Sequence, residues 1–218
     1  MSIIKFVDRY VKKECAVCKF FWNYPVYDPN RIDNVPKLYH IVAHFCPHCN
    51  YVSEDISTKE SFCEKHMESK EYKKIWLTKN KKYELTSHKT VVNYLALAYL
   101  KNHNHEYDKE CKAYLMAGEN EYEMMHSYSL SAMYTPADEP MIKNSSKLVT
   151  QYYNKALVAI IKYFEDKQTI SNNEELLLCL CLIKNQRKGE AVKRMIEILK
   201  SKPDHDTMLT IKALNEME

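Results

Sequence analysis

The chain contains 218 residues, with 32 basic and 29 acidic side chains, eight cysteines and two glycines. This length suffices for one domain or two small ones with a buried core, and so few glycines argue against phosphate-binding loops and large β-barrels and favour helices. The net charge of +3 gives no global electrostatic case for nucleic acid or for an anionic membrane, so any such case has to be local.

The apolar segments are too short for a targeting or membrane function. The N-terminus lacks the long apolar core of a signal peptide, and the longest apolar run, Leu176–Ile183, is too short to span a bilayer. We therefore expect a cytoplasmic protein that does not enter the membrane. In that reducing compartment, eight cysteines favour metal ligation and free thiols over a disulfide framework.

Two C-x-x-C hooks follow residues 1–13, which predict a short strand or a helix. Cys15-Ala-Val-Cys18 is answered, after a gap of 27 residues, by Cys46-Pro-His-Cys49. One tetrahedral ion accepts four thiolates at about 2.3 Å each, which closes its coordination shell. We therefore predict one structural zinc ion per chain, held by Cys15, Cys18, Cys46 and Cys49, although the same four thiolates also suit iron.

A redox dithiol is the alternative interpretation of this motif. Thioredoxin-like chemistry needs one pair at the start of a helix in a βαβ unit, whereas this chain has two pairs and the second follows strand-like sequence. Pro47 and Asn50 fit the tight turn of the second hook, because proline presets one φ angle and asparagine tolerates left-handed backbone. Lys19, at the equivalent place in the first hook, fits less well.

Four other residues near the hooks are potential metal ligands: His44, His48, Cys63 and His66. The four hook cysteines already fill a tetrahedron. We therefore interpret the histidines as surface residues and Cys63 as a helix residue.

The segment between the hooks has two parts. Trp22–Arg31 contains two prolines and several turn formers, which predict an irregular loop resting on aromatic side chains. Leu38–Phe45 alternates apolar and polar residues, which predicts a half-buried strand that leads into Cys46.

After about residue 55 the pattern becomes helical. Ser57 or Ser61 is a candidate cap for a helix that continues to about Trp76. The end of this helix and the segment after it are basic, with Tyr72 and Trp76 between the lysines, a combination able to stack on a nucleic-acid strand and neutralise it. The lysines are Lys70, Lys73, Lys74, Lys79, Lys81 and Lys82. A solvated helix end is the alternative.

Helices make up the rest of the chain. An amphipathic segment, Val91–Leu100, follows a start signal at Ser87, and Tyr107–Tyr134 is a second helical stretch with Gly118 as a candidate break and Pro136–Pro140 as its end. Short polar turns separate the remaining segments, so neighbours should pack antiparallel. These segments are about Ser146–Phe164, Leu176–Ile183, Ala191–Leu199 and Met208–Leu214.

The last 45 residues resemble a tetratricopeptide unit, which is a helix-turn-helix repeat. The large, small, aromatic and terminating positions of that repeat fall on Leu178, Cys179, Leu182, Ala191, Met195, Ile198 and Pro203. The match is loose, since Cys179 replaces a glycine and Leu182 and Met195 replace aromatic residues. An ordinary helix pair is the alternative, and both give stacked hairpins, because one pair cannot bury its apolar face alone.

The chain resembles, over nearly its whole length, the bacterial family catalogued as domain of unknown function 2225. The resemblance depends on the two hooks, on Tyr-His-Ile-Val-Ala-His-Phe-Cys-Pro-His-Cys-Asn-Tyr at the second hook, on the repeat-like C-terminus, and on Arg31, Asp33 and Phe62. Ala16 and Asn50 replace a commoner proline and glycine without removing a ligand. The family implies a zinc ribbon joined to a tetratricopeptide-like region, and it carries no established activity.

We therefore predict a mainly α protein, with a four-cysteine zinc ribbon of short strands in residues 1–55 and an antiparallel, tetratricopeptide-like array of helical hairpins in residues 56–218. Its expected function is that of a non-enzymatic, zinc-stabilised module that binds a peptide or protein partner in a helical groove. Candidate anchors in that groove are Tyr152, Tyr153 and Tyr163. Two alternatives stay open: nucleic-acid binding through the zinc ribbon and the Lys70–Lys82 patch, and an enzyme of the thiol or redox class.

Overall fold

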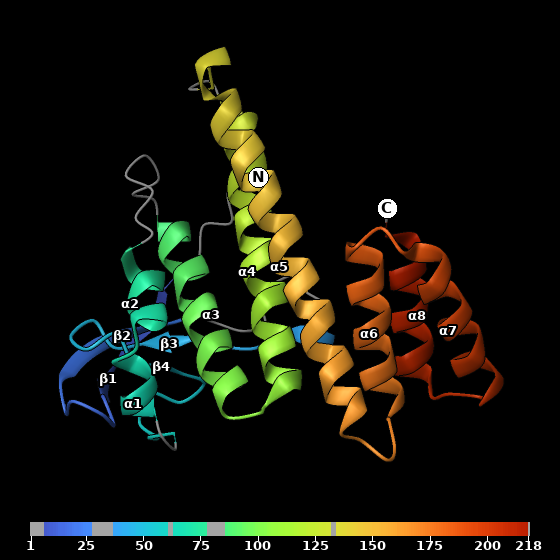
Figure 1. The fold of residues 1–218 in the computed structure, drawn as a ribbon, viewed down its shortest axis with the longest axis horizontal. Coiled ribbons are helices and arrows are strands. Elements are labelled where there is room, and N and C mark those ends of the chain that lie inside the picture. Colours follow the sequence, from blue (N-terminus) through green and yellow to red (C-terminus); the bar gives the residue numbers. More distant parts are fainter. Residues whose placement is uncertain (1–6, 28–36, 61–62, 78–85, 132–133, 218) are drawn as a thin grey trace.

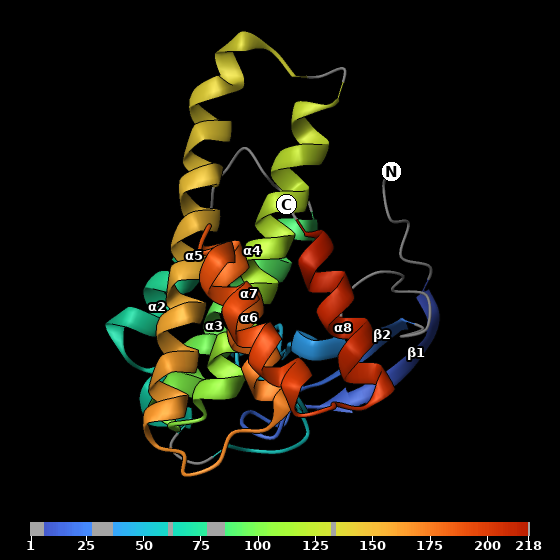
Figure 2. The ribbon, with the colours of Figure 1, turned by 90° about the vertical axis from the view of Figure 1, so that its right-hand side faces the viewer.

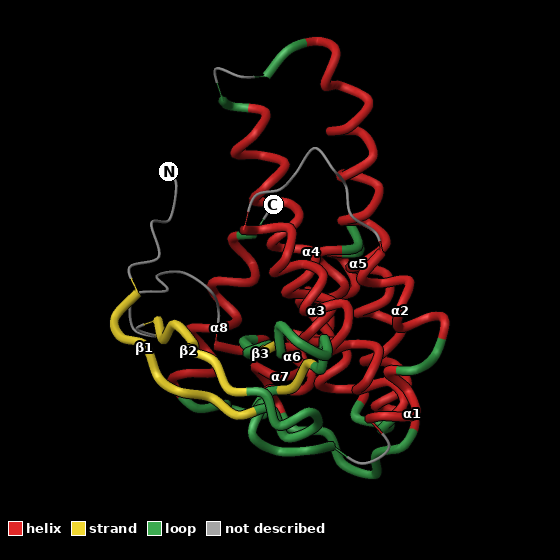
Figure 3. Tube along the Cα trace, turned by 90° about the vertical axis from the view of Figure 1, so that its left-hand side faces the viewer, coloured by secondary structure: helices red, strands yellow, loops and turns green. Residues whose placement is uncertain are grey.

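The protein is mainly helical, with a few short antiparallel strands near the N-terminus (Figure 1). The computed structural model describes residues 7–27, 37–60, 63–77, 86–131 and 134–217. Figure 3 shows that the strands gather on one side of the helices. Within the described ranges, no helix is both long and apolar enough to cross a membrane.

The first hook joins two antiparallel strands, β1 (Val7–Glu14) and β2 (Phe21–Tyr27). From Val7 onward the lead-in segment, for which both a strand and a helix were considered, is thus a strand, and its residues 1–6 lie outside the described part of the chain. The irregular loop predicted from Trp22 is wrong as far as Tyr27, and residues 28–31 are not described. Pro25 stands opposite Tyr10 in this ladder. A proline is tolerated there because both members of a two-stranded ribbon are edge strands, so its missing N–H interrupts no second ladder.

The second hook joins β3 (His44–Phe45) to β4 (Val52–Ser53). The strand predicted from Leu38 is therefore much shorter, and a 3-10 turn, η2 (Lys37–Tyr39), occupies its start. Its alternation is still present as burial, since Tyr39 and Ile41 are buried whereas residues 40 and 42 are exposed. A helix side chain takes the place of a neighbouring strand here, because the Tyr94 hydroxyl donates to the Ile41 carbonyl at 3.1 Å.

Two short helices follow, α1 (Cys63–Met67) and α2 (Lys70–Leu77), where one longer helix was predicted. Ser69 divides them: its hydroxyl accepts the Tyr72 N–H at 3.1 Å and caps α2. Of the predicted caps, Ser57 lies in a turn in which its N–H donates to the Asp55 carboxylate. Ser61 lies outside the described residues.

Three antiparallel helices form the centre: α3 (Thr86–His103), α4 (Tyr107–Ser129) and α5 (Glu139–Glu165). The C-terminal half of α4 and the N-terminal half of α5 project beyond the other helices as a two-helix arm (Figures 1 and 2). The candidate break at Gly118 does not occur, since α4 is continuous there. A capping box between Thr135 and Asp138, in the short turn η3 (Pro136–Asp138), starts α5 earlier than the predicted Ser146.

The last three helices are α6 (Asn172–Lys184), α7 (Lys188–Lys200) and α8 (His205–Glu216). The α6–α7 hairpin closes at two small residues, where the Cys179 thiol lies 3.6 Å from the Ala191 carbonyl oxygen. Both residues are fully buried, so the close approach depends on their size. This pair suits the small positions of a tetratricopeptide unit, but the repeat character itself stays a prediction.

One continuous hydrophobic core extends from the hooks to α8. Lys101 of α3 links the hook region to the helices. The residue is 2% exposed, and its ammonium contacts the carboxylates of Glu60 at 2.8 Å, Glu54 at 3.2 Å and Glu106 at 3.2 Å. The Tyr72 hydroxyl adds a bond of 2.6 Å to the Asn50 carbonyl. A boundary near residue 55 therefore lies within a shared core, and the division into two domains there stays a prediction.

The two glycines give a matched pair of helix substitutions. A Cβ added at Gly118 would lie 2.5 Å from the Tyr153 ring of α5, whereas one added at Gly189 in α7 meets nothing within 4 Å. We expect Gly189→Ala to raise the free energy of unfolding by about 0.5–1 kcal/mol, through helix propensity. Gly118→Ala should lower it by about 1–3 kcal/mol, through overpacking. Chemical denaturation measures both, and a stabilised Gly118→Ala protein would contradict the close packing of α4 on α5.

Candidate metal centre

The four hook cysteines meet in one cluster. The Sγ atoms of Cys15 and Cys49 are 3.7 Å apart, those of Cys18 and Cys46 are 3.6 Å apart, and all four lie within 4.8 Å of one another. An ion about 2.3 Å from each sulfur in tetrahedral geometry places the sulfurs about 3.8 Å apart. The four thiols are free of disulfides, so they could hold a metal ion of this geometry.

The first hook is a hairpin turn that aims two sulfurs at one point. The Lys19 N–H donates to the Cys15 carbonyl at 2.9 Å, and the Cys15 N–H donates to the Phe20 carbonyl at 3.0 Å. Between these bonds the chain needs a left-handed residue, and Lys19 has a φ of 60°. Lys19 therefore adopts a left-handed conformation that is sterically unfavourable for lysine, as its weaker fit to the turn predicted.

The second hook repeats the same bonds. The Asn50 N–H donates to the Cys46 carbonyl at 3.0 Å, the Cys46 N–H donates to the Tyr51 carbonyl at 2.8 Å, and Asn50 has a φ of 62°. Because both turns have one geometry, each presents its sulfurs to the other. The Ala16 N–H also donates to the Ile56 carbonyl at 3.0 Å, which fixes the first hook to the segment after the second.

Backbone N–H groups and burial set the charge of the cluster. Burial acts to raise the pKa of the Cys18 thiol, but hydrogen bonds from the Phe20 N–H, from His48 and from neighbouring thiols outweigh it and lower this pKa to about 6. Burial raises the pKa of the Cys46 and Cys49 thiols. Four thiolates this close repel one another, so a cation at their centre stabilises the charged form and releases protons as it binds.

The histidines near the hooks are not part of the group of ligand atoms, although His48 hydrogen-bonds to the Cys18 thiol. The His48 ring stacks on Phe20, with ring centroids 5.3 Å apart, and His66 lies against the His103 ring at 4.3 Å. His44 is half-buried, and that burial lowers the pKa of its imidazole. Among the described residues, the cysteines of the hooks form the single group of three or more potential ligand atoms.

The other four cysteines are buried among the helices. Cys63 lies in α1 as predicted, and Cys179 packs in the α6–α7 hairpin. Cys111 of α4 and Cys181 of α6 are fully buried with their Sγ atoms 3.5 Å apart. Burial raises the pKa of the Cys111 thiol, so this thiol is protonated in the folded protein, and burial shields both cysteines from reagents.

The predicted lysine patch is described only in part. Lys70, Lys73 and Lys74 are exposed on α2, while Lys79, Lys81 and Lys82 lie outside the described residues. Tyr72, one of the two interleaved rings, is 2% exposed, and Trp76 packs toward Phe45 with ring centroids 6.5 Å apart. The rings between the lysines thus face the core and do not present a stacking surface beside these lysines.

The predicted tyrosine anchors are also part of the core. Tyr152 and Tyr153 are 8% and 7% exposed, and Tyr153 donates to the Glu119 carboxylate at 3.0 Å. Tyr163 is half-buried and its hydroxyl bonds to the Glu174 carboxylate. Their helical spacing along α5 is typical of a buried face, and none of them lines the apolar groove between α7 and α8.

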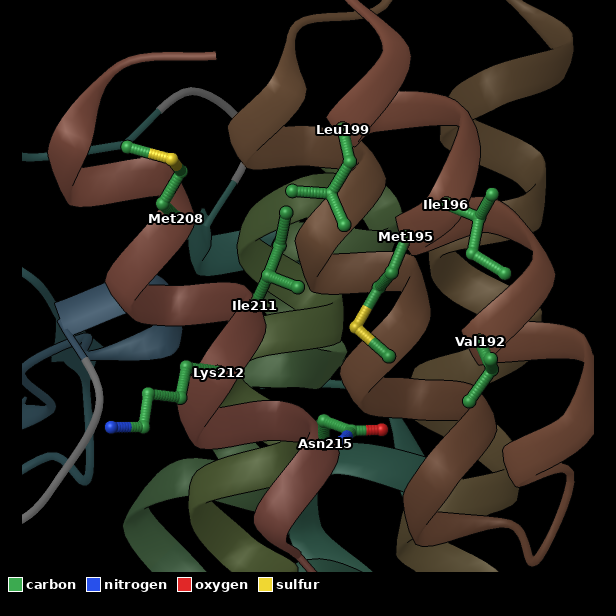
Figure 4. A pocket seen from close by; sticks show the side chains of 8 residues that line it. All are labelled: Val192, Met195, Ile196, Leu199, Met208, Ile211, Lys212 and Asn215. Atoms are coloured by element: carbon green, nitrogen blue, oxygen red, sulfur yellow. The ribbon is translucent and has the colours of Figure 1, made fainter. Parts of the chain in front are cut away.

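An apolar groove between α7 and α8 is the feature that the sequence analysis missed (Figure 4). Its volume is about 300 Å³. It is lined by Val192, Met195, Ile196, Leu199, Met208, Ile211, Lys212 and Asn215. The available signal was a second apolar stripe on α7, formed by Val192, Ile196 and Leu199 at helical spacing beside the buried stripe of Ala191, Met195 and Ile198.

Comparison with known proteins finds no relative. No known family matches the sequence, and neither a curated protein nor a solved structure matches it at a significant level. Function is therefore inferred from the geometry of the chain's own residues.

The left-handed residues of the hooks provide a stability test. Lys19→Gly should raise the free energy of unfolding of the metal-loaded protein by about 1 kcal/mol, because glycine adopts a positive φ without the steric cost that lysine has. The Lys19–Glu14 ion pair lost in this variant spans 3.8 Å at the surface and contributes little. Asn50→Gly is the control and should gain less, since asparagine tolerates this conformation. Thermal unfolding compares the two, and a destabilised Lys19→Gly protein would contradict the strain assigned to the hook.

Proposed function

We propose that this protein is a non-enzymatic interaction module, in which a structural zinc ion fixes the hooks and the groove between α7 and α8 binds an apolar segment of a protein partner. The groove is the observation that supports this proposal. Ile196, Leu199 and Met208 leave 47%, 45% and 45% of their surface exposed at its rim, while Met195 and Ile211 are buried at its floor. Exposed apolar side chains around a concavity are typical of an interaction site.

The apolar lining of the groove favours a helical or extended peptide over a metabolite as its ligand. Its polar lining consists of Lys212 and Asn215, which is too little to orient a polar substrate. The apolar side chains that α7 and α8 place around it instead suit an amphipathic helix that inserts anchors at i, i+3 or i+4 spacing. Affinity would then come from apolar burial by a few side chains and depend weakly on salt.

Zinc is the metal that we assign to the hooks. Four cysteines close the tetrahedral shell, which leaves no position for water or substrate and makes the ion structural. In a hairpin with little core of its own, such an ion contributes directly to folding. The burial of Tyr72 argues against nucleic acid on α2, because a strand held by the lysines there would lack this stacking partner.

The resemblance to domain of unknown function 2225, with its zinc ribbon followed by tetratricopeptide-like hairpins, agrees with this proposal. Membership of that family and the repeat character of α6 and α7 are part of what we propose. The tests below act on the ion and the groove separately, so that either can fail alone.

Metal content and thiol reactivity test the ion. Purified protein should contain one zinc per chain, and its eight thiols should react slowly with an alkylating reagent because four are bound and four are buried. A chelator should make the four hook thiols react rapidly with the reagent, and a denaturant should make all eight thiols react rapidly. Cys46→Ser should lose the metal while circular dichroism retains most helicity, whereas the control Cys63→Ala should keep it. Metal retention in Cys46→Ser, or iron in place of zinc, would refute the assignment.

Peptide selection tests the groove. Peptides selected from a displayed random library should carry large apolar residues at helical spacing, and Leu199→Glu should weaken their binding at least tenfold by placing a charge in the groove. Val158→Glu is the matched control, since Val158 is 54% exposed on α5 and does not line the groove. Raising salt should change the affinity little.

Two outcomes would place the binding site on another surface of the protein. Peptides that bind Leu199→Glu as well as the unchanged protein would place the interaction elsewhere. Binding that falls steeply with salt and disappears in Lys70→Gln, Lys73→Gln and Lys74→Gln variants would instead identify α2 as the binding surface.

A further inference from the structure

Three aromatic rings form a row across the two hooks. The His48 ring stacks on Phe20, with ring centroids 5.3 Å apart and an interplanar angle of 14°, and Phe20 stacks on Trp22, at 6.2 Å and 19°. The rings come from both hooks, so the row exists only while the four sulfurs hold the hooks together. We call His48, Phe20 and Trp22 the ring row.

The ring row is accessible to a ligand. Phe20 leaves 40% of its surface exposed and His48 is exposed, while Trp22 is half-buried against the core and anchors the row. A stacked phenylalanine so open to water adds little to the core, since its exposed part gains no burial energy. Parallel rings at a surface are the arrangement on which unpaired bases stack, because every base has a flat π-face.

Two lysines neighbour rings of the row. Lys19 immediately precedes Phe20, and its side chain is 71% exposed. Lys13 stands directly opposite Trp22 in the β1–β2 ladder, on the same face of the ribbon. Glu14 is 3.8 Å from Lys19. Asp55, the other acidic group near Lys13, is held by the Ser57 N–H and the Thr58 hydroxyl.

The excess of positive charge lies in the first part of the sequence. Residues 1–27 contain five basic and two acidic side chains, which equals the net charge of +3 of the full sequence. The remaining residues are balanced, with 27 of each sign. Residues 28–60 contain three basic and five acidic side chains, so any attraction for a phosphate backbone is local to the β1–β2 hairpin and does not extend over the whole hook end.

We propose that the ring row is a stacking platform for single-stranded nucleic acid, with an unpaired base on the outer face of His48, at the end of the row, and phosphates near Lys13 and Lys19. This site is independent of the groove between α7 and α8 and of the lysines of α2. It selects unpaired bases without reading their sequence, because the described rings offer stacking surfaces and no fixed set of hydrogen-bond partners for a base edge.

Binding of labelled oligo(dT) and oligo(rU), about ten nucleotides long to match a small binding site, to the zinc-loaded full chain tests the proposal. Anisotropy should show binding that weakens as salt rises, with a logarithmic slope that falls by about 0.7 for each of Lys13→Gln and Lys19→Gln. Phe20→Leu should weaken binding about tenfold or more. Oligonucleotide should also quench Trp22 emission in a Trp76→Phe background.

Phe21→Leu is the matched control. Phe21 is 63% exposed and adjacent in sequence, but it points to the opposite face of the ribbon, so binding should not change. Zinc content and thiol protection verify that each variant is folded, and His48→Ala provides a second test if Phe20→Leu loses its metal.

Three results would overturn the proposal. They are the absence of binding at low salt, equal binding of duplex and single strands, and binding that survives Phe20→Leu and His48→Ala. Loss of binding in Lys70→Gln, Lys73→Gln and Lys74→Gln variants with the ring row intact would assign the strand to α2. Failure of the ring row leaves the groove proposal untouched, because the two use different residues and different probes.

Discussion

The convergence of four sulfurs is the constraint from which the N-terminal part of the structure follows. Cys18 and Cys46 are separated by 27 residues, yet their Sγ atoms lie 3.6 Å apart. Closing this long loop costs entropy, which the backbone hydrogen bonds of the hooks help to offset and which a bound ion would offset further. The stacking of Phe20 on His48 depends on that closure, because the two rings come from different hooks.

Much of this arrangement follows from short-range sequence patterns. The hooks, the left-handed Asn50 and the helical periods of α3 to α8 are local signals, and the structure brings the four cysteines together and confirms a mainly helical chain. Short-range signals failed where a distant contact decided the outcome. Tyr94 replaces a strand partner for Ile41, and Tyr153 fills the space that makes Gly118 a packing position and not a break.

The functional surfaces were harder to predict for the same reason. Tyr152 and Tyr153 were candidate anchors because aromatic residues are common at interfaces, but their period placed them in the core. Leu199 and Met208 meet across two helices, and their shared groove depends on the crossing of α7 and α8, which no single segment encodes. His48 and Phe20 likewise come from different hooks, so their stacking is a product of the closed cluster.

The buried ammonium of Lys101 makes the helices sensitive to the state of the hooks. Two of its three carboxylate partners, Glu54 and Glu60, belong to the segment that immediately follows the second hook. When that segment loosens, a charge that is 2% exposed loses most of its compensation, and the cost falls on the turn between α3 and α4. Opening of the cysteine cluster is thereby transmitted as an electrostatic penalty to helices that contain none of its ligands.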